Sequence, residues 1–323
     1  MNQSENQPND CFPTADMERG AAVAFGFFDG LHCGHQQLLE TLMKTAQENG
    51  YVDVVHTFSN HPLSILGDGH PPMLFTSEEK WQALRAFGVK HVCMVPFTRA
   101  LSQLTYKAFM KSLMHTIPIR EVVVGFNYRL GVDREGTTDK LAELGKELGF
   151  SVTVVPPVLY EGKPISSTRI RGLLHQGDLK SATAMLGRPF SISGKVGKGF
   201  QLGSQIGFPT ANTAYLPDKV LVPNGVYASL SVCDGMVYPS ITNVGSRPTV
   251  SSLGQINIET HILEFSGDLY KKVLEVRFLE KIRDEQAFPS TEALSAQIKA
   301  DIERAKKIHA RIDVDYSKTA MLK

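Results

Sequence analysis

The sequence predicts an α/β part with a parallel sheet, followed by an antiparallel β-barrel with a closing helix. Three observations carry this prediction: the chain has 323 residues, its first half alternates short apolar runs with stretches of helical period, and its second half spaces short strand-like runs closely between glycine-rich turns. About 150 residues are typical of one domain, so two are expected. We place a disordered tail at residues 1–20, the first domain at 21–187 and the second at 188–323.

The first half repeats a strand–helix pattern from residue 21 onward. The apolar run "AAVAFGFF" precedes the helical stretch "CGHQQLLETLMKTAQENG", and the further strand-like runs are "YVDVVHTF", "VKHVCMVPF", "REVVVGF" and "FSVTVVP". Short apolar strands separated by helices indicate βαβ units, whose parallel sheet is covered on both faces. We therefore expect a doubly wound, Rossmann-like sheet that binds ligands beyond the carboxyl ends of its strands.

The pattern changes after "MLGRPF". The strand-like runs are now "SISGKVGKGFQLGSQIGFPTAN", "GVYASLSV", "MVYPSITNV", "INIETHILEF" and "KKVLEVRFLEKI". Short strands at close spacing with glycine-rich turns are typical of an antiparallel barrel or sandwich. The stretch from Ser290, "STEALSAQIKADIERAKKIHARI", has helical spacing, a Ser/Thr cap and Glu292 in its first turn. A closing helix is therefore expected.

The composition is that of a soluble globular protein. Hydrophobic residues make up 42% and charged residues 21% of the chain, and no apolar run approaches the ~20 residues that span a bilayer. The 34 Lys and Arg balance 33 Asp and Glu, so the net charge gives no reason to expect a nucleic-acid partner. The four cysteines form no CxxC pair, which favours reduced thiols over a disulfide framework or a zinc ribbon. The first 20 residues lack the features of a secretory signal, and we expect a cytoplasmic protein.

A turn rich in glycine and histidine, "FGFFDGLHCGH", ends the first predicted strand. Gly30 and Gly34 let the backbone turn and approach a ligand, and the helix that begins near Cys33 directs its amides outward. His32 and His35 could donate N–H bonds to a phosphate whose negative charge grows during displacement at phosphorus. Zinc ligation by "HCGH" and a pair of ordinary capping or surface histidines are the alternatives on this stretch alone.

A second phosphate-binding pattern, "ISSTRIR", occupies residues 165–171. Hydroxyls at a helix N-terminus can hold phosphates while arginines neutralise them. Taken alone, the stretch favours a helix cap followed by solvated arginines over a phosphate site. Together, an early HxGH and a late SSTxIR on one Rossmann-like unit resemble the nucleotidyltransferase superfamily, which transfers AMP from ATP without a covalent enzyme intermediate.

Four motifs narrow this resemblance. "GFFDGLHCGH", "TFSNHP", "VVVGFNYRLG" and "ISSTRIRGLLHQGDL" resemble, in order and spacing, the adenylyltransferase module of the bacterial bifunctional riboflavin kinase/FAD synthetase family. The resemblance implies that His32 and His35 stabilise the transition state at the α-phosphate, and that His61 and Asn127 lie near the nucleotide or the incoming FMN phosphate. The implied ATP-binding residues are Gly26, Phe28, Asp29, Gly30, Ser166, Ser167, Thr168, Arg169 and Arg171.

The second set of motifs begins at the glycine-rich run "GKVGKGFQLGSQIGFPTAN". This run lacks the GK[ST] ending of a Walker loop. A glycine-rich turn between strands can still hold ATP phosphates, and Thr210 and Asn212 can hold Mg²⁺ beside them. A flexible hairpin with a Pro-stabilised turn is the alternative for this run alone. From the residues alone, Glu259 on its alternating strand is expected to be an outward-facing charge.

"GFPTAN", "GVY", "NVGSRPT" and "IETHILEF" resemble the riboflavin kinase barrel of the same family. The resemblance implies that Glu259 is the general base toward the ribityl 5′-hydroxyl as it attacks the γ-phosphorus of ATP, and that Arg247 and Arg283 contact riboflavin. The implied ATP-binding residues of the barrel are Gly194, Gly197, Lys198, Gly203, Gly207, Thr210 and Asn212.

Three family motifs are altered in this chain. Asn60 takes the place of the first proline of the usual "TFxPHP". Asn127 in "GFNYRLG" is neutral, where the family often has the charged residue of "GFDFRFG". Lys271 in "LYKK" stands where the family commonly has the glycine of "LYGK". If that glycine supplies a positive φ, Lys271 strains its loop by about 1 kcal/mol.

The expected function is a two-step transferase with ATP, riboflavin and FMN as its small-molecule partners. Riboflavin and ATP give FMN and ADP at the barrel, and FMN and ATP give FAD and pyrophosphate at the Rossmann-like domain, each reaction with Mg²⁺ and neither with a nucleic acid or a membrane. The alternatives are a chain that retains one of these activities, and a flavin-sensing or RNA-binding regulator on the same scaffold.

Overall fold

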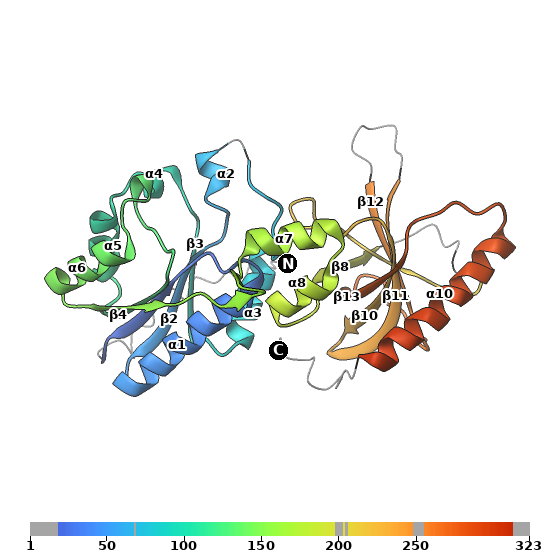
Figure 1. Cartoon of the computed structure of the whole chain (residues 1–323), viewed down its shortest axis with the longest axis horizontal. Helices are drawn as coiled ribbons and strands as arrows, with labels where there is room; N and C mark the ends of the chain where they lie inside the picture. Colours follow the sequence, from blue (N-terminus) through green and yellow to red (C-terminus); the bar gives the residue numbers. More distant parts are fainter. Residues whose placement is uncertain (1–18, 68, 198–202, 204–205, 248–254, 313–323) are drawn as a thin grey trace, which may run out of the picture. The chain divides into compact units, whose positions relative to one another are not determined.

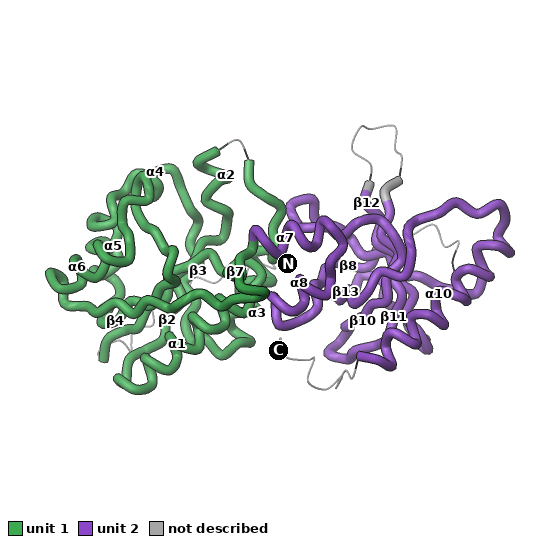
Figure 2. Tube along the Cα trace, viewed as in Figure 1, with its two compact units in different colours: residues 1–167, 322–323 green, residues 168–321 purple. Residues whose placement is uncertain are grey.

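The computed structural model describes residues 19–67, 69–197, 203, 206–247 and 255–312 (Figure 1). Most of the predicted tail, together with Lys198 and the Arg247 side chain, lies outside the described residues. The chain forms two compact units that divide between Ser167 and Thr168 (Figure 2). This division lies earlier in the chain than the domain boundary near residues 186–190, which stays a prediction.

The first unit contains the predicted parallel sheet, and all four of its strand pairs are parallel. Its strand order is β3-β2-β1-β4-β5, so the direction of winding reverses at β1. In a doubly wound sheet this reversal opens a ligand crevice at the carboxyl ends of the strands. The strands are β1 (Ala21–Phe25), β2 (Val52–Phe58), β3 (His91–Val95), β4 (Ile119–Gly125) and β5 (Ser151–Val155).

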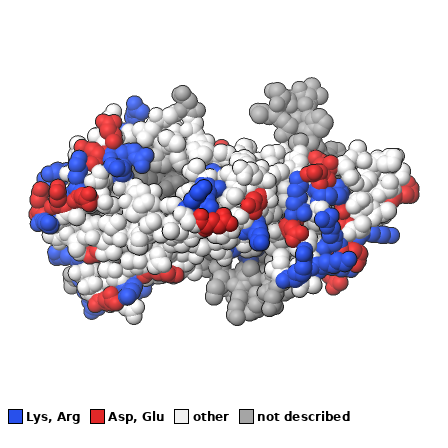
Figure 3. All heavy atoms as spheres, in the orientation of Figure 1, with Lys and Arg blue, Asp and Glu red and all other residues white. Residues whose placement is uncertain are grey.

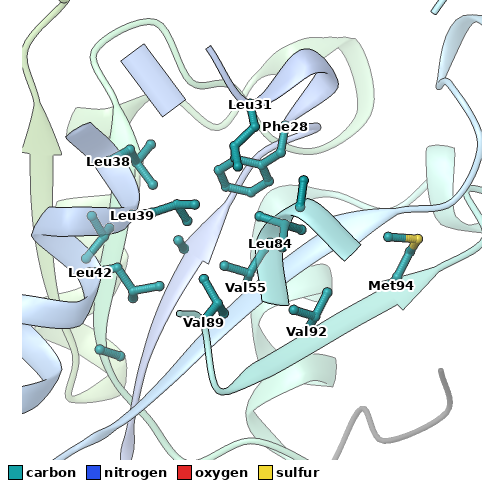
Figure 4. Close-up of a cluster of buried hydrophobic side chains, with 14 of the residues drawn as sticks. Phe28, Leu31, Leu38, Leu39, Leu42, Val55, Leu84, Val89, Val92 and Met94 are labelled. Carbon is teal, nitrogen blue, oxygen red and sulfur yellow. The ribbon is translucent and has the colours of Figure 1, made fainter. Parts of the chain in front are cut away.

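Two apolar clusters cover the two faces of this sheet. Leu39 and Leu42 of α1 and Leu84 of α3 pack in the first cluster (Figure 4). Phe109 of α5 and Leu141 of α6 pack in the second. Each fully buried leucine stabilises the fold by roughly 1.5–3 kcal/mol. The helices and short 3₁₀ turns are η2 (Asp29–Leu31), α1 (Cys33–Asn49), α2 (Leu63–Leu66), α3 (Ser77–Ala86), α4 (Arg99–Ser102), α5 (Tyr106–Met114), η3 (Val132–Arg134) and α6 (Thr138–Leu148).

The second unit contains a closed antiparallel barrel with strand order β10-β11-β12-β9-β8-β13, which confirms the predicted barrel. A long helix, α10 (Thr291–Arg311), packs Ala305 and Ile308 against Val226 and Ala228 of the barrel. The strands are β8 (Ser191–Gly197), β9 (Ala211–Thr213), β10 (Gly225–Cys233), β11 (Met236–Arg247), β12 (Gln255–Ile262) and β13 (Val273–Arg283). Before the barrel, the chain forms α7 (Ser167–Gln176), which begins at the last residue of the first unit, and α8 (Leu179–Leu186). The short strands β6 (Leu159–Tyr160) and β7 (Lys163–Pro164) belong to the first unit.

Two local predictions for the second unit are confirmed. Ser290 caps α10, because its side chain accepts a hydrogen bond from the backbone N–H of Ala293, and Glu292 lies in the first turn. Lys271, which stands where the family motif has glycine, adopts a φ of +66°. This left-handed conformation costs a residue with a side chain about 1 kcal/mol.

His56 of β2 makes the stability of the first unit depend on pH. Its ring packs against Phe25, Phe58 and Phe109 at centroid distances of 5.6, 5.8 and 5.6 Å. Burial lowers the pKa of His56 from 6.5 to about 4. The unfolded chain therefore binds more protons than the folded chain between these two values, and stability falls as the pH falls through this window.

We expect His56 to reduce the free energy of unfolding by about 2 kcal/mol when the pH is lowered from 7 to 5. Urea unfolding at both pH values measures this loss, and the fluorescence of Trp81, the one tryptophan of the chain, reports on the first unit. His56→Leu removes the titrating group and should make the loss smaller by that amount. An equal loss in the variant would contradict the assignment.

Candidate active sites

The turn after β1 brings His32 and His35 into direct contact. The turn is left-handed at three residues, with φ values of +54° at Phe28, +76° at Gly30 and +41° at Leu31. The imidazole rings of His32 and His35 stack, with centroids 3.7 Å apart and an angle of 12° between their planes. Glycine adopts such angles freely, whereas the other two residues need support from their surroundings.

His32 caps helix α1. Its Nδ1 accepts a hydrogen bond of 3.3 Å from the backbone N–H of His35. A neutral imidazole that accepts at Nδ1 carries its proton on Nε2, so Nε2–H is the group that can donate to a ligand. His32 is thus an N-cap of α1, as one alternative for this stretch expected, and a neutral His32 whose Nδ1 accepts this bond has its ring proton on Nε2.

His35 is held in its neutral form. Desolvation is the largest cause of a pKa well below 6.5, and electrostatic coupling to His32 and then to Lys80 acts in the same direction. Its Nδ1 is buried and has no hydrogen-bond partner among the described residues. A neutral imidazole keeps one N–H to donate and does not change charge near pH 7.

The sheet brings other predicted residues to the same edge. His61 follows β2, and its ring lies 4.9 Å from the ring of Phe27. Asn127 follows β4 and is exposed. Strands β2 and β4 flank β1, so His61 and Asn127 lie on either side of the histidine turn at the carboxyl end of the sheet.

Three further predicted residues help to form the turn. The Phe28 side chain is fully buried in the apolar cluster of α1 and α3 (Figure 4). A Cβ at Gly26 would lie 2.9 Å from the Phe28 ring, so this position needs glycine. The carboxylate of Asp29 accepts hydrogen bonds from the backbone N–H groups of Leu74 and Phe75 at 3.1 and 2.9 Å. The side chains of Phe28 and Asp29 therefore hold the turn in place.

The "ISSTRIR" stretch spans the start of α7. Ser167 Oγ donates a hydrogen bond of 2.9 Å to the carbonyl oxygen of Asp29, which ties the first residue of α7 to the histidine turn. Ser166, immediately before it, is half-buried. The other three residues predicted to bind ATP follow on α7 in the second unit, with Thr168 exposed, Arg169 half-buried and Arg171 buried.

The barrel unit contains two cavities that share Thr210. The smaller, of about 320 Å³, is lined by Glu259, Asn243 and Arg283, among others. The larger, of about 640 Å³, is lined by Gly197, Thr260 and residues 265–270, among others. Both volumes are in the range of small-molecule sites.

Glu259 lines the smaller cavity, which favours a binding role over an outward-facing charge. In the barrel it lies directly opposite Asn212 on one neighbouring strand and Asn243 on the other. Opposite residues of neighbouring strands project from the same face. The Nδ2 of Asn257 donates to Glu259 Oε1 at 2.6 Å. This hydrogen bond orients the Glu259 carboxylate, which shares its face of the barrel with Asn212 and Asn243.

Arg283 is oriented by a buried acid that sequence reasoning missed. Its Nε lies 2.9 and 3.2 Å from the carboxylate oxygens of Asp301 on α10, and Gln297 also donates to Asp301. The Arg283 guanidinium carbon lies 5.5 Å from the centroid of the Phe288 ring. Asp301 is 3% exposed and follows Ile298 on the apolar side of α10. A charged residue among the apolar positions of a helix was the available signal.

The other predicted glycines of the barrel have different surroundings. Gly203 lines the smaller cavity, and Gly207 is an exposed turn residue with a φ of +87°. Gly194 pairs with Leu274, and the carbonyl oxygen of Ala214 approaches it so closely that a Cβ would clash. Gly194 is thus required by strand packing, while Gly197 and Gly203 lie at the cavities.

Two further observations concern membrane-spanning helices and the distribution of surface charge. Within the described ranges, we find no helix with the length and apolar character needed to cross a bilayer. On the face drawn in Figure 3, acidic side chains lie among the basic ones in both units.

The fold and the two sites define a class of two-module transferase that acts on phosphoryl and nucleotidyl groups. A FAD synthetase family model matches residues 14–169, and a riboflavin kinase family model matches residues 186–309. The bifunctional riboflavin kinase/FMN adenylyltransferase of Pseudomonas fluorescens is 35% identical over 90% of this chain and 94% of its own length. That of Escherichia coli strain K12 is 37% identical over 88% and 91%. The chain belongs to the family of bifunctional riboflavin kinase/FMN adenylyltransferases.

A solved structure supports the same two-unit fold. It is described as a macrolide-efflux protein from Streptococcus pneumoniae, is 31% identical to this chain and has a TM-score of 0.82. The similarity covers 90% of this chain and 94% of that one.

Proposed function

We propose that this chain converts riboflavin to FMN at the barrel and FMN to FAD at the parallel sheet, with ATP as the donor in both reactions. The family supports both activities, and each family model matches the part of the chain that carries the corresponding site. The observation that carries the proposal is the presence of a formed site in each part: the stacked imidazoles after β1 and the cavity-lining Glu259 of β12. Because both reactions consume ATP, we propose the cytoplasm as the place of action.

In FAD formation, a phosphate oxygen of FMN attacks the α-phosphorus of ATP, and pyrophosphate leaves. Negative charge accumulates on the oxygens at this phosphorus, where preorganised N–H donors stabilise it most. His32 offers Nε2–H, and neutral His35 offers its own N–H. Ser166, Ser167, Thr168, Arg169 and Arg171 are proposed for the ATP phosphates on the strength of the family motif, as are His61 and Asn127 for the FMN phosphate.

In FMN formation, Glu259 accepts the proton of the ribityl 5′-hydroxyl while the oxygen of that hydroxyl attacks the γ-phosphorus of ATP, and ADP leaves. The smaller cavity, which contains Glu259 and Arg283, is proposed for riboflavin. The larger cavity, which contains Gly197, is proposed for ATP. Thr210 lines both and is therefore suited to the phosphate that is transferred.

Magnesium is proposed as the metal of the kinase reaction. The side-chain oxygens of Thr210 and Asn212 are hard donors that suit Mg²⁺, which usually takes its other ligands from water and substrate phosphates. Asn212 lies opposite Glu259, so these oxygens belong to the same part of the barrel. When bound, Mg²⁺ would neutralise charge on the phosphates.

The test is a time course of the purified full chain with riboflavin, ATP and Mg²⁺, in which FMN and FAD are separated by chromatography. We expect FMN to appear first and FAD to follow, and EDTA in excess of the metal to stop both. FMN without FAD would contradict the adenylyltransferase half, and no FMN would contradict the kinase half. Absence of both products, with RNA retained on a filter, would favour a regulator.

A further inference from the structure

A buried lysine lies beside the histidine turn. Lys80 of α3 is 2% exposed, which is rare for a residue that carries a full charge. Its Nζ donates hydrogen bonds to the carbonyl oxygens of Phe27 and Phe58 at 3.1 and 2.6 Å. Nζ also lies 3.8 Å from the centroid of the Phe27 ring, a cation–π distance. Burying an ammonium is costly unless such contacts offset its lost hydration.

The two carbonyls come from the site edge of the sheet. Phe58 is the last residue of β2, and Phe27 begins the turn after β1. Thr57 Oγ1 also donates to the Phe27 carbonyl, at 3.3 Å. Lys80 therefore joins the carboxyl ends of two neighbouring strands directly before the left-handed residue Phe28.

The chain around α3 holds the same turn from a second side. The backbone of Leu74 and Phe75, just before α3, donates to Asp29. A capping box between Thr76 and Glu79 fixes the first turn of α3, which begins at Ser77, three residues before Lys80. The fixed start of α3 thus places the Lys80 ammonium at Phe27, while the segment just before α3 holds Asp29.

The charge of Lys80 acts on the imidazoles as well as on the backbone. Its positive charge is one of the causes that lower the pKa of His35. Burial lowers the pKa of Lys80 itself to about 8, while the carboxylate of Asp29 opposes this shift. Near pH 7 Lys80 is thus mostly charged. Its charge acts on the carboxylate of Asp29 in η2 and on the imidazole of His35, which stacks with His32. A fixed positive charge at this place favours a transition state that gains negative charge.

We propose that Lys80 is a positioning residue of FMN adenylylation, which holds the histidine turn in its left-handed form and contributes a positive charge to the site near neutral pH. This inference rests on the proposed function. Lys80 acts through the turn and its imidazoles, so its loss should lower kcat for FAD formation more than it raises the KM for ATP or FMN.

The experiment compares Lys80→Met and Lys80→Arg with the wild-type full chain. We expect Lys80→Met to lower kcat for FAD formation by about 10-fold or more, and Lys80→Arg to restore part of it. FMN formation in the same sample is the internal control and should stay within about two-fold, because the kinase site is in the barrel. The matched control is Lys44→Met, which removes an exposed lysine of α1 that pairs with Glu48 and should change neither rate. Trp81 fluorescence verifies folding of the first unit.

The pH profile separates charge from structure. In the wild-type protein, kcat for FAD formation should fall as the pH rises through about 8, because Lys80 loses its proton. In Lys80→Arg this decline should move to higher pH, since a guanidinium stays charged. Three results would each overturn the inference. The wild-type kcat for FAD formation could show no decline near pH 8, the decline could stay at the same pH in an active Lys80→Arg variant, or a folded Lys80→Met variant could keep the full wild-type kcat. Wild-type protein that makes no FAD would instead refute the proposed function itself.

Discussion

His32→Ala should lower the rate of FAD formation by about 10²–10³-fold, the usual loss when one preorganised donor to a developing oxyanion is removed. The stacked geometry with His35 and the Nδ1 bond to the helix leave Nε2–H as the donor of His32. FMN formation by the same preparation should remain within about two-fold of wild type, because Glu259 and its cavity are in the barrel unit. Separate assays, one supplied with FMN and one with riboflavin, measure the two rates.

Alanine at this position also removes a helix cap, worth about 1 kcal/mol. The matched variant His32→Asn separates the two roles, because asparagine is a good cap and has no imidazole. We expect His32→Asn to unfold at nearly the wild-type urea concentration and to be as inactive in FAD formation as His32→Ala. Recovery of activity in His32→Asn would mean that His32 serves only as a cap.

The sequence predicted the parts of this fold that depend on local pattern. The apolar runs from residue 21 became parallel strands, and the Ser290 cap with Glu292 began the closing helix as expected. The positive φ at Lys271 was also predictable, because one motif position called for glycine. Periodicity, caps and turn chemistry act over a few neighbouring residues, and such signals are visible in one sequence.

Contacts between distant segments were not predictable in this way. In the sequence "SEEKWQALRAFG", nothing distinguishes Lys80 from a surface lysine. Only folding brings its ammonium to the carbonyl oxygens of Phe27 and Phe58. The pairing of Asp301 with Arg283 joins α10 to β13 across 18 positions of sequence. Phe28 and Asp29 show the same limit, since their motif did not indicate that the Phe28 side chain packs in the apolar cluster or that the Asp29 carboxylate accepts hydrogen bonds from the backbone.

Glu259→Gln should lower the rate of FMN formation by about 10²–10⁴-fold, the range typical of a positioned general base. Glutamine fits the same space and can keep the hydrogen bond from Asn257, but it cannot take the proton of the ribityl 5′-hydroxyl. With FMN supplied, FAD formation should be unaffected. The matched control is Glu264→Gln, an exposed residue of the same unit that should change neither rate. If a folded Glu259→Gln variant phosphorylated riboflavin at the wild-type rate, positioning and charge neutralisation alone would carry the reaction, and Glu259 would not be its base.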